Sequence, residues 1–279
     1  IYNTGADSTI SGNTLTGNVT GIYVSSTNTA VTSNTITGGT TGISASNSTT
    51  TLPPILISNN TVSQATSYGI VAYYNGVTLQ SNIIFDNNIG AYLIYGGIAS
   101  DNTIFSNTDG IVTSNSASRI TNNRIFANTR HGIDISSYSG GVQVEGNQIY
   151  SNLNGIRVSS GVGFSNSIIR NNLIYSNSQN GIWISNAYDQ QLSPVIQSNT
   201  FYQSTGSAFR LDASSSNIRL RNNIFLLDNA NAINVASDSQ NGFDSDYNLF
   251  YTTAAGSIGL WEYTPFAASI SGLADWYYE

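Results

Sequence analysis

The sequence predicts an all-β solenoid: a rod of about eleven stacked coils built from very short strands, followed by a short C-terminal cap. Two observations carry this prediction. An asparagine-centred phrase recurs every 20–27 residues, and each repeat holds three short stretches in which apolar and polar residues alternate. Alternation with a period of two is typical of strands, and no stretch before residue 250 keeps the 3.6-residue period of a helix.

The recurring phrase contains an asparagine, an apolar residue two positions later, often an aromatic residue, and a second asparagine. Residues 123–128, for example, are Asn-Arg-Ile-Phe-Ala-Asn. The first asparagine, the anchor, occurs at Asn13, Asn34, Asn60, Asn82, Asn102, Asn123, Asn147, Asn172, Asn199, Asn223 and Asn248. Asparagine tolerates the backbone angles of a tight bend, and its amide can bond to amides above and below it. We therefore expect one internal asparagine ladder.

A second phrase, Gly-Ile-x-apolar or a close variant, follows the anchors, as in residues 132–135. Its isoleucine and its last residue should point inward, so that x and the residue two positions beyond it point outward. A unit of ~22 residues cannot bury its apolar face alone, but stacked units can, and their parallel strands would lie ~4.8 Å apart. Aromatic residues that recur at one coil position should stack as packing: Phe85, Phe105, Phe126, Tyr150, Tyr175 and Tyr202.

Composition excludes several classes of partner and site. Charged residues make up 8% of the chain, the net charge is −7 and there is no lysine, so neither nucleic acid nor an anionic membrane is an expected partner. No apolar run approaches the ~18 residues of a membrane span. Without cysteine, disulfides and thiol nucleophiles are excluded, and the single histidine excludes a multi-histidine metal site. We expect no cofactor and no metal.

These repeats resemble the right-handed parallel β-helix family, the pectin-lyase-like proteins with short β-helix repeats, over residues 1–250. The resemblance implies a right-handed winding and a secreted or cell-surface location. It does not fix the activity, because the family includes pectate lyases, polygalacturonases, alginate epimerases, phage tailspikes, adhesins and non-catalytic surface proteins. Residues 251–279 are expected to form a C-terminal capping extension, with a short helix at residues 271–276. Because the chain begins inside a coil, a further N-terminal portion is also expected.

One outward strip gathers charged and aromatic residues: His131, Asp134, Arg157, Trp183, Arg210 and Asp212. Tryptophan stacks on the CH faces of sugars, and arginine binds carboxylates or paired hydroxyls, so this strip is a candidate polysaccharide-binding site. The structural alternative is an ion pair between Asp134 and Arg157 on adjacent strands. It also includes a cation–π contact between Trp183 and Arg210.

The residues support a catalytic site less well than they support a binding site. Residues 130–133, Arg-His-Gly-Ile, are similar to a stretch of mannuronan C5-epimerases and related lyases, whose histidine takes part in proton transfer. Those enzymes also carry Asp-Pro-His-Asp/Glu about two coils earlier, where residues 88–93 hold no acid and no histidine. Asp134 and Asp212 should lie ~14 Å apart, beyond the ~6.5–9.5 Å of inverting glycosidases. In residues 244–248, side chains that could offer oxygen ligands to calcium occur at alternate positions, but a turn is expected there.

A second outward patch is apolar and consists of Tyr73, Tyr92, Ile94 and Val112. Contiguous outward apolar residues are unusual for a free surface, so we expect a loop, a glycan or a neighbouring subunit to cover them. The favoured function is a non-catalytic extracellular or cell-surface module that binds polysaccharide or assembles with other surface proteins, including copies of itself. The alternative is a polysaccharide-active enzyme of lyase or C5-epimerase type, with its catalytic residues unassigned.

Overall fold

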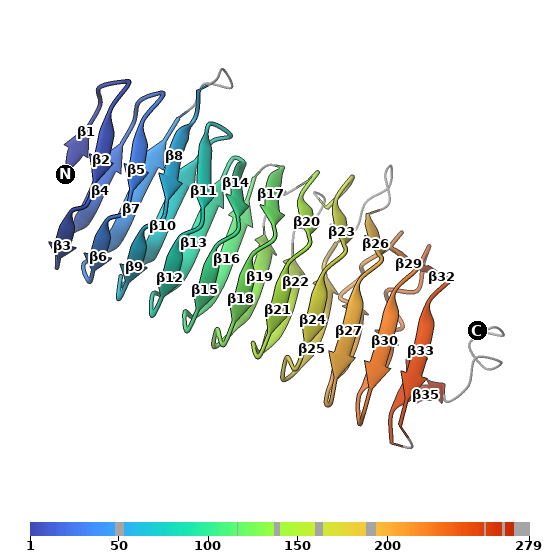
Figure 1. The fold of residues 1–279 in the computed structure, drawn as a ribbon. Coiled ribbons are helices and arrows are strands. Elements are labelled where there is room, and N and C mark those ends of the chain that lie inside the picture. Colours follow the sequence, from blue (N-terminus) through green and yellow to red (C-terminus); the bar gives the residue numbers. More distant parts are fainter. Residues whose placement is uncertain are drawn as a thin grey trace.

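A computed structural model of the protein describes residues 1–47, 53–115, 117–136, 140–159, 164–187, 194–253, 255–263 and 266–270. In this part of the chain 35 strands form three sheets that run along a rod (Figure 1). No helix among the described residues is long and apolar enough to cross a membrane. The helix expected at residues 271–276 lies outside the described residues.

Up to β34, each sheet takes every third strand in chain order, and β35 joins sheet A as an additional strand. Sheet A contains β1 (Tyr2–Asn3), β4 (Thr20–Val24), β7 (Thr41–Ser46), β10 (Tyr68–Tyr73), β13 (Ile89–Ile94), β16 (Asp109–Ser114), β19 (His131–Ser136), β22 (Asn154–Ser159), β25 (Asn180–Ser185), β28 (Ser207–Asp212), β31 (Asn231–Val235), β34 (Ser257–Tyr263) and β35 (Phe266–Ile270). Sheet B contains β2 (Thr9–Ser11), β5 (Ala30–Thr32), β8 (Ile55–Ser58), β11 (Val77–Gln80), β14 (Gly97–Ser100), β17 (Ser118–Thr121), β20 (Gln143–Glu145), β23 (Ile168–Arg170), β26 (Val195–Gln197), β29 (Arg219–Arg221) and β32 (Asp244–Asp246). Sheet C contains β3 (Thr14–Thr16), β6 (Thr35–Thr37), β9 (Thr61–Ser63), β12 (Ile83–Phe85), β15 (Thr103–Phe105), β18 (Arg124–Phe126), β21 (Gln148–Tyr150), β24 (Leu173–Tyr175), β27 (Thr200–Gln203), β30 (Ile224–Leu227) and β33 (Leu249–Thr252).

Parallel pairing between successive coils confirms the predicted solenoid. In every sheet a strand pairs with the equivalent strand one coil earlier and one coil later, as β16, β19 and β22 do in sheet A. At the C-terminal end β34 adds to β31 in parallel, and β35 then pairs with β34 in antiparallel orientation. The last parallel edge of sheet A is therefore covered by a strand of the same chain.

The core is a column of inward aliphatic side chains. In one coil Ile120, Ile125 and Ile133 come from the three sheets, and each is fully buried. The glycine before the inward isoleucine has a steric role. A Cβ atom on Gly132 would lie 2.6 Å from the carbonyl oxygen of Gly155 in the next coil. The Gly-Ile phrase therefore combines a close approach between coils with a large core side chain.

The anchors form the predicted ladder along the whole described rod. Each anchor from Asn13 to Asn223 donates its Nδ2 hydrogen to Oδ1 of the next anchor, at 2.9–3.1 Å. The same Oδ1 atoms accept the backbone N–H of the preceding anchor, as Asn147 does for Asn123 at 2.8 Å. Every coil thus satisfies its buried polar groups through its neighbour.

A second ladder lies inside the rod, which the sequence analysis did not anticipate. Its members are Asn87, Asn107, Asn128, Asn152 and Asn177. Their Nδ2–Oδ1 distances are 3.0–3.1 Å. The ladder continues into Gln203, whose Oε1 accepts the backbone N–H of Asn177 at 2.9 Å. Each of these asparagines lies five residues after an anchor, so the repeat did contain the signal.

The predicted aromatic column lies on the outer side of sheet C. Four consecutive contacts join the rings of Phe85, Phe105, Phe126, Tyr150 and Tyr175. The ring centroids lie 4.6–5.1 Å apart, with interplanar angles of 3–9°. Tyr202 occupies the next register position, but its hydroxyl donates to Asp228 Oδ2 at 2.9 Å. The column therefore serves as packing between coils.

Candidate functional site

The predicted strip lies on sheet A, and its register is the one expected. Asp134, Arg157, Trp183 and Arg210 are direct neighbours on β19, β22, β25 and β28. Asp212, two residues after Arg210, lies in the adjacent outward column. Consecutive coils therefore place one side chain of the strip beside the next along the rod.

These side chains form a continuous network. Arg157 Nη1 donates to Asp134 Oδ2 at 3.4 Å, which is the expected ion pair. The Arg157 guanidinium also lies over the Trp183 ring, 5.4 Å from its centroid. Trp183 Nε1 donates to Asp212 Oδ1 at 2.9 Å, and Arg210 Nε donates to Asp212 Oδ2 at 2.7 Å. The cation on Trp183 is thus Arg157 rather than Arg210, because Arg210 turns toward the Asp212 carboxylate.

Beside this network lies a further ion pair, between adjacent coils, that sequence analysis missed. Arg130 Nε donates to Asp109 Oδ1 at 2.9 Å, and Arg130 Nη2 contacts Oδ2 of the same carboxylate. Asp109 is 1% exposed. It occupies the position before the glycine of the Gly-Ile phrase, as His131 does on the next coil. Aligning the residue before this glycine in every coil would have drawn attention to Asp109 and so to the pair.

His131 is buried, whereas a surface histidine was expected. Only 5% of it is exposed, because it lies in the first register position of sheet A between Asp109 and Asn154. Its Nδ1 lies 3.4 Å from Asn154 Nδ2, and Asn180 Nδ2 donates to Asn154 Oδ1 at 2.7 Å. Burial lowers the pKa of His131 from 6.5 to about 4, against the opposing effect of the Asp109 carboxylate. The ring is therefore neutral at neutral pH.

The pKa of Asp134 is shifted in the opposite direction. Burial raises its pKa from 3.8 to about 6, although the Arg157 guanidinium acts against this rise. Its Oδ1 and the Nε of Arg157 are buried and have no hydrogen-bond partner among the described residues. An acceptor and a donor on adjacent strands are thus both left without a protein partner, which is unusual for buried polar groups.

The apolar patch consists of Tyr73, Tyr92, Ile94 and Val112, on the N-terminal side of the strip. Val112 is buried within the chain, while the other three side chains are half-buried. The ring of Tyr92 stacks on Tyr68 at 5.5 Å, and its hydroxyl is 3.1 Å from Ser114 Oγ. Tyr92 is therefore held by contacts within the chain, and what covers the patch stays a prediction.

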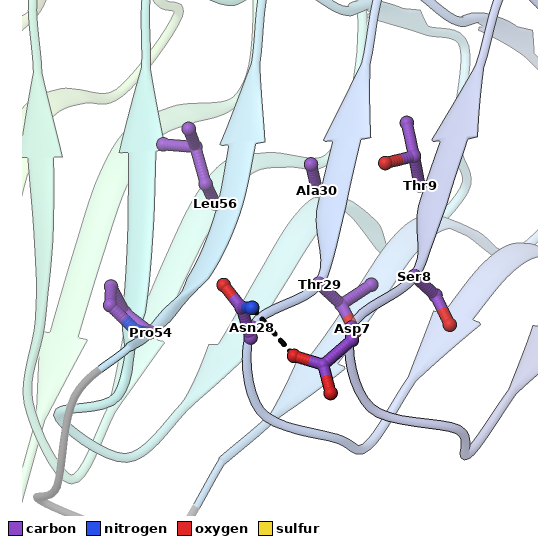
Figure 2. Close-up of a pocket in the computed structure, with 8 residues that line it drawn as sticks. All are labelled: Asp7, Ser8, Thr9, Asn28, Thr29, Ala30, Pro54 and Leu56. Carbon is purple, nitrogen blue, oxygen red and sulfur yellow. Dashed lines mark hydrogen bonds between the residues drawn. The ribbon is translucent and has the colours of Figure 1, made fainter.

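A shallow hollow of about 280 Å³ lies at the N-terminal end of sheet B (Figure 2). Its lining comprises Asp7, Ser8, Thr9, Asn28, Thr29, Ala30, Pro54 and Leu56. Figure 2 shows Asn28 Nδ2 donating to Asp7 Oδ1, a distance of 2.6 Å. The one acid of the hollow is therefore already bonded, and the hollow lies several coils from the strip on sheet A.

The calcium-like segment forms strand β32 rather than the expected turn, because residues 244–246 pair with β29. Asp244 contacts Arg221, and Asp246 Oδ1 accepts the backbone N–H of Tyr247 at 2.8 Å. Within the described ranges, no three histidine, aspartate or glutamate side chains are grouped to hold a metal.

Comparisons with known proteins agree on the fold. The sequence profile of the family described as "Right handed beta helix region" matches residues 20–164, 55–193 and 151–265. Among solved structures, the Dettilon tailspike protein is similar over 92% of this chain at 15% identity, with a TM-score of 0.56, and this chain spans 63% of its length. An alginate lyase from a Paenibacillus strain covers 90% of this chain and 99% of its own, at 14% identity and a TM-score of 0.55. A double mutant of the periplasmic alginate epimerase AlgG covers 83% and 71%, at 13% identity and the same TM-score. No curated protein sequence matches.

Proposed function

Because this chain belongs to the right-handed β-helix family, whose stacked coils present long flat sheets, we propose that it binds a polysaccharide along sheet A. The observation that carries the proposal is the unpartnered pair of Asp134 Oδ1 and Arg157 Nε. Both atoms are closed to solvent in this structure, so a sugar hydroxyl would donate to the carboxylate oxygen and accept from the guanidinium N–H once these side chains turn outward. Each unpaired buried group costs about 1–3 kcal/mol, so a ligand that pairs both gains affinity.

The rest of the strip supports an extended ligand. Successive coils place side chains at ~4.8 Å intervals, which suits a polymer of repeating units running along the rod. Trp183 is held by Asp212 and Arg157, so its ring is fixed before a ligand arrives. Two of the similar structures are named for alginate, and one of them is named as periplasmic. These names favour an acidic polysaccharide met outside the cytoplasm, whose carboxylates would meet Arg157 and Arg210 locally although the net charge of the chain is −7.

Replacing Arg157 with glutamine should lower the affinity for the bound polysaccharide by tenfold or more. The variant loses one of the two unpartnered groups and leaves the Asp134 carboxylate without its cation. Isothermal titration with acidic and neutral polysaccharides measures the loss. Arg170→Gln on sheet B is the matched control, because Arg170 also pairs with an acid one coil earlier, Glu145, at 2.9 Å. An equal loss for both variants would contradict a site on sheet A.

Trp183→Ala tests the aromatic part of the same site. We expect an affinity loss of roughly 1–3 kcal/mol, because an aromatic anchor contributes about this much when it is held in place. The indole also supports Arg157, so the two variants should be non-additive when combined. A Trp183→Ala variant that binds every tested polysaccharide as well as the parent would remove this strip as the site.

A second candidate function is proton transfer on the bound polymer, of lyase or C5-epimerase type. It is favoured by a buried Asp134 whose pKa is raised to about 6, flanked by two arginines and a neutral histidine. A base would take the C5 proton of a uronate. In elimination the released electron pair would form the C4–C5 double bond as the bond from C4 to the leaving oxygen breaks, and that oxygen would take a proton from water. Epimerisation would instead return a proton to C5 from the opposite face. Ultraviolet absorbance of unsaturated uronates, together with proton exchange at C5 in heavy water, separates both from simple binding, which gives neither.

The apolar patch is our proposed contact for a covering partner, such as a second copy of the chain. Tyr73 and Ile94 are half-buried neighbours on β10 and β13. Replacing both with serine should lower the self-association seen by sedimentation velocity. Sugar affinity at the strip should stay within twofold of the parent, because the patch lies on different coils. A parent protein that is monomeric at every concentration tested would contradict self-assembly.

A further inference from the structure

We infer that Asn154 and Asn180 hold His131 in its Nε2–H tautomer. The ring nitrogen that does not face Asn154, Nε2, is then a hydrogen-bond donor and not a base. His131 lies one coil before Asn154, and Asn154 lies one coil before Asn180. The three side chains form a chain of polar contacts through the buried first register position of sheet A. Neither asparagine belongs to the two ladders, so the ladders do not explain why these two side chains are held in place.

The direction of the contacts sets the tautomer. Asn180 Nδ2 donates to Asn154 Oδ1 at 2.7 Å, which uses the oxygen of the Asn154 amide. The Nδ2 of Asn154 is then the group that faces His131 Nδ1, at 3.4 Å. An amide nitrogen can only donate, so Nδ1 must accept and carries no proton. The proton of the neutral ring is therefore on Nε2.

The surroundings keep the ring neutral. Burial, together with the Arg157 and Arg130 guanidiniums, lowers the pKa of His131 to about 4. The Asp109 carboxylate, on the strand before His131, acts in the opposite direction. Among the described residues no group hydrogen-bonds to Nε2. The Nε2–H group is thus a donor without an acceptor in the part of the chain that the structure describes.

This tautomer narrows what the site can recognise, a step that rests on the proposed function. The ligand atom that meets His131 must be an acceptor oxygen, from a hydroxyl, a ring ether or a carboxylate. Asp134 Oδ1 supplies the complementary acceptor. If the site transfers protons, the base is Asp134 and not His131. Asn154 and Asn180 are then positioning residues that act through the histidine.

The lone histidine makes a direct test possible. Protein labelled with ¹⁵N only at histidine gives one pair of ring nitrogen signals, and protonated and bare nitrogens resonate far apart. At pH 7.5, without ligand, we expect a bare Nδ1 and a protonated Nε2. A protonated Nδ1 would overturn the inference, and so would a ring that exchanges freely between the two tautomers.

Two variants test the role of the asparagines. Asn154→Asp places a carboxylate beside Nδ1, so the proton should move to Nδ1. Asn180→Ala frees the Asn154 amide to turn over, so the signals should shift toward an average of both tautomers. Asn222→Asp, on an exposed turn, adds the same charge as Asn154→Asp and should leave the spectrum unchanged. If either variant fails to fold, the parent spectrum still decides the tautomer.

Adding ligand separates this inference from the proposed function. A uronate oligosaccharide that binds sheet A should shift the protonated Nε2 signal and leave Nδ1 bare. A parent that shows the Nε2–H tautomer but binds no uronate oligosaccharide would keep the inference and contradict the proposed ligand. A bound oligosaccharide that leaves Nε2 unshifted would overturn the donor role while binding itself stands.

Discussion

Replacing Asn147 with alanine is expected to lower the free energy of unfolding by about 3 kcal/mol. The Oδ1 of Asn147 accepts from both the backbone N–H and the Nδ2 of Asn123. Its Nδ2 donates to the Ile120 carbonyl and to Asn172 Oδ1. Alanine removes these four bonds and the 3.2 Å bond from Nδ2 to the Glu145 carbonyl, at a residue that is 1% exposed. The buried backbone N–H of Asn123 then loses its acceptor, which costs more than the loss of an average exposed hydrogen bond.

A urea titration followed by circular dichroism measures this loss. The matched control is Asn88→Ala, which removes an exposed asparagine next to the second ladder and should change the stability by less than ~0.5 kcal/mol. Because each coil contacts only its neighbours, the Asn147 variant should also broaden the transition, as the rod divides into two less coupled halves. An unchanged urea midpoint for Asn147→Ala would rule out the ladder as a source of stability.

Asp134 and His131 should give the protein two opposing pH dependences. Asp134 has a pKa of about 6 in the folded state and 3.8 as its reference value, so the folded state binds its proton more tightly. Its contribution therefore raises stability as pH falls from 6 to 4. His131 has a pKa of about 4 in the folded state and 6.5 as its reference value. Its contribution therefore lowers stability as pH falls over nearly the same range. Each contribution is on the order of 3 kcal/mol.

Single variants should separate the two contributions. Relative to the parent, Asp134→Asn should lose stability as pH falls from 6.5 to 4, because the stabilising proton uptake is gone. His131→Gln should gain stability relative to the parent over the same range. The double variant is the control, and its difference from the parent should stay nearly constant with pH. Denaturant titrations at several pH values measure all three. Two single variants with slopes of the same sign would contradict the burial of one of these groups.

The fold could be predicted because the same physical solution repeats in every coil. A buried anchor such as Asn123 leaves a polar group that only an equivalent residue one coil away can satisfy. That requirement fixes register, and register in turn places outward residues in columns. The column from Tyr92 through Val112 to Asp134 and on to Arg210 therefore follows from counting residues between anchors.

The site itself could be predicted only in part. Counting gives the neighbours of Arg157, but not that its guanidinium contacts both Asp134 and the Trp183 ring. Long side chains choose among several acceptors, and the choice depends on rotamers that a repeat pattern does not encode. The burial of His131 was also missed, because the position before the glycine was not treated as a column. The lowered pKa of His131 follows from that burial, so it could not be predicted for the same reason.

The direction of the anchor ladder has a further consequence. In all ten of its bonds an amide nitrogen points toward the C-terminal coil and an amide oxygen toward the N-terminal coil. Amide groups carry a dipole of about 3.5 D, and aligned dipoles add as they do in a helix. The rod therefore has an electrical axis, with partial negative charge at its first coil and partial positive charge at its last. Two such rods that lie side by side attract each other when they are antiparallel and repel each other when they are parallel.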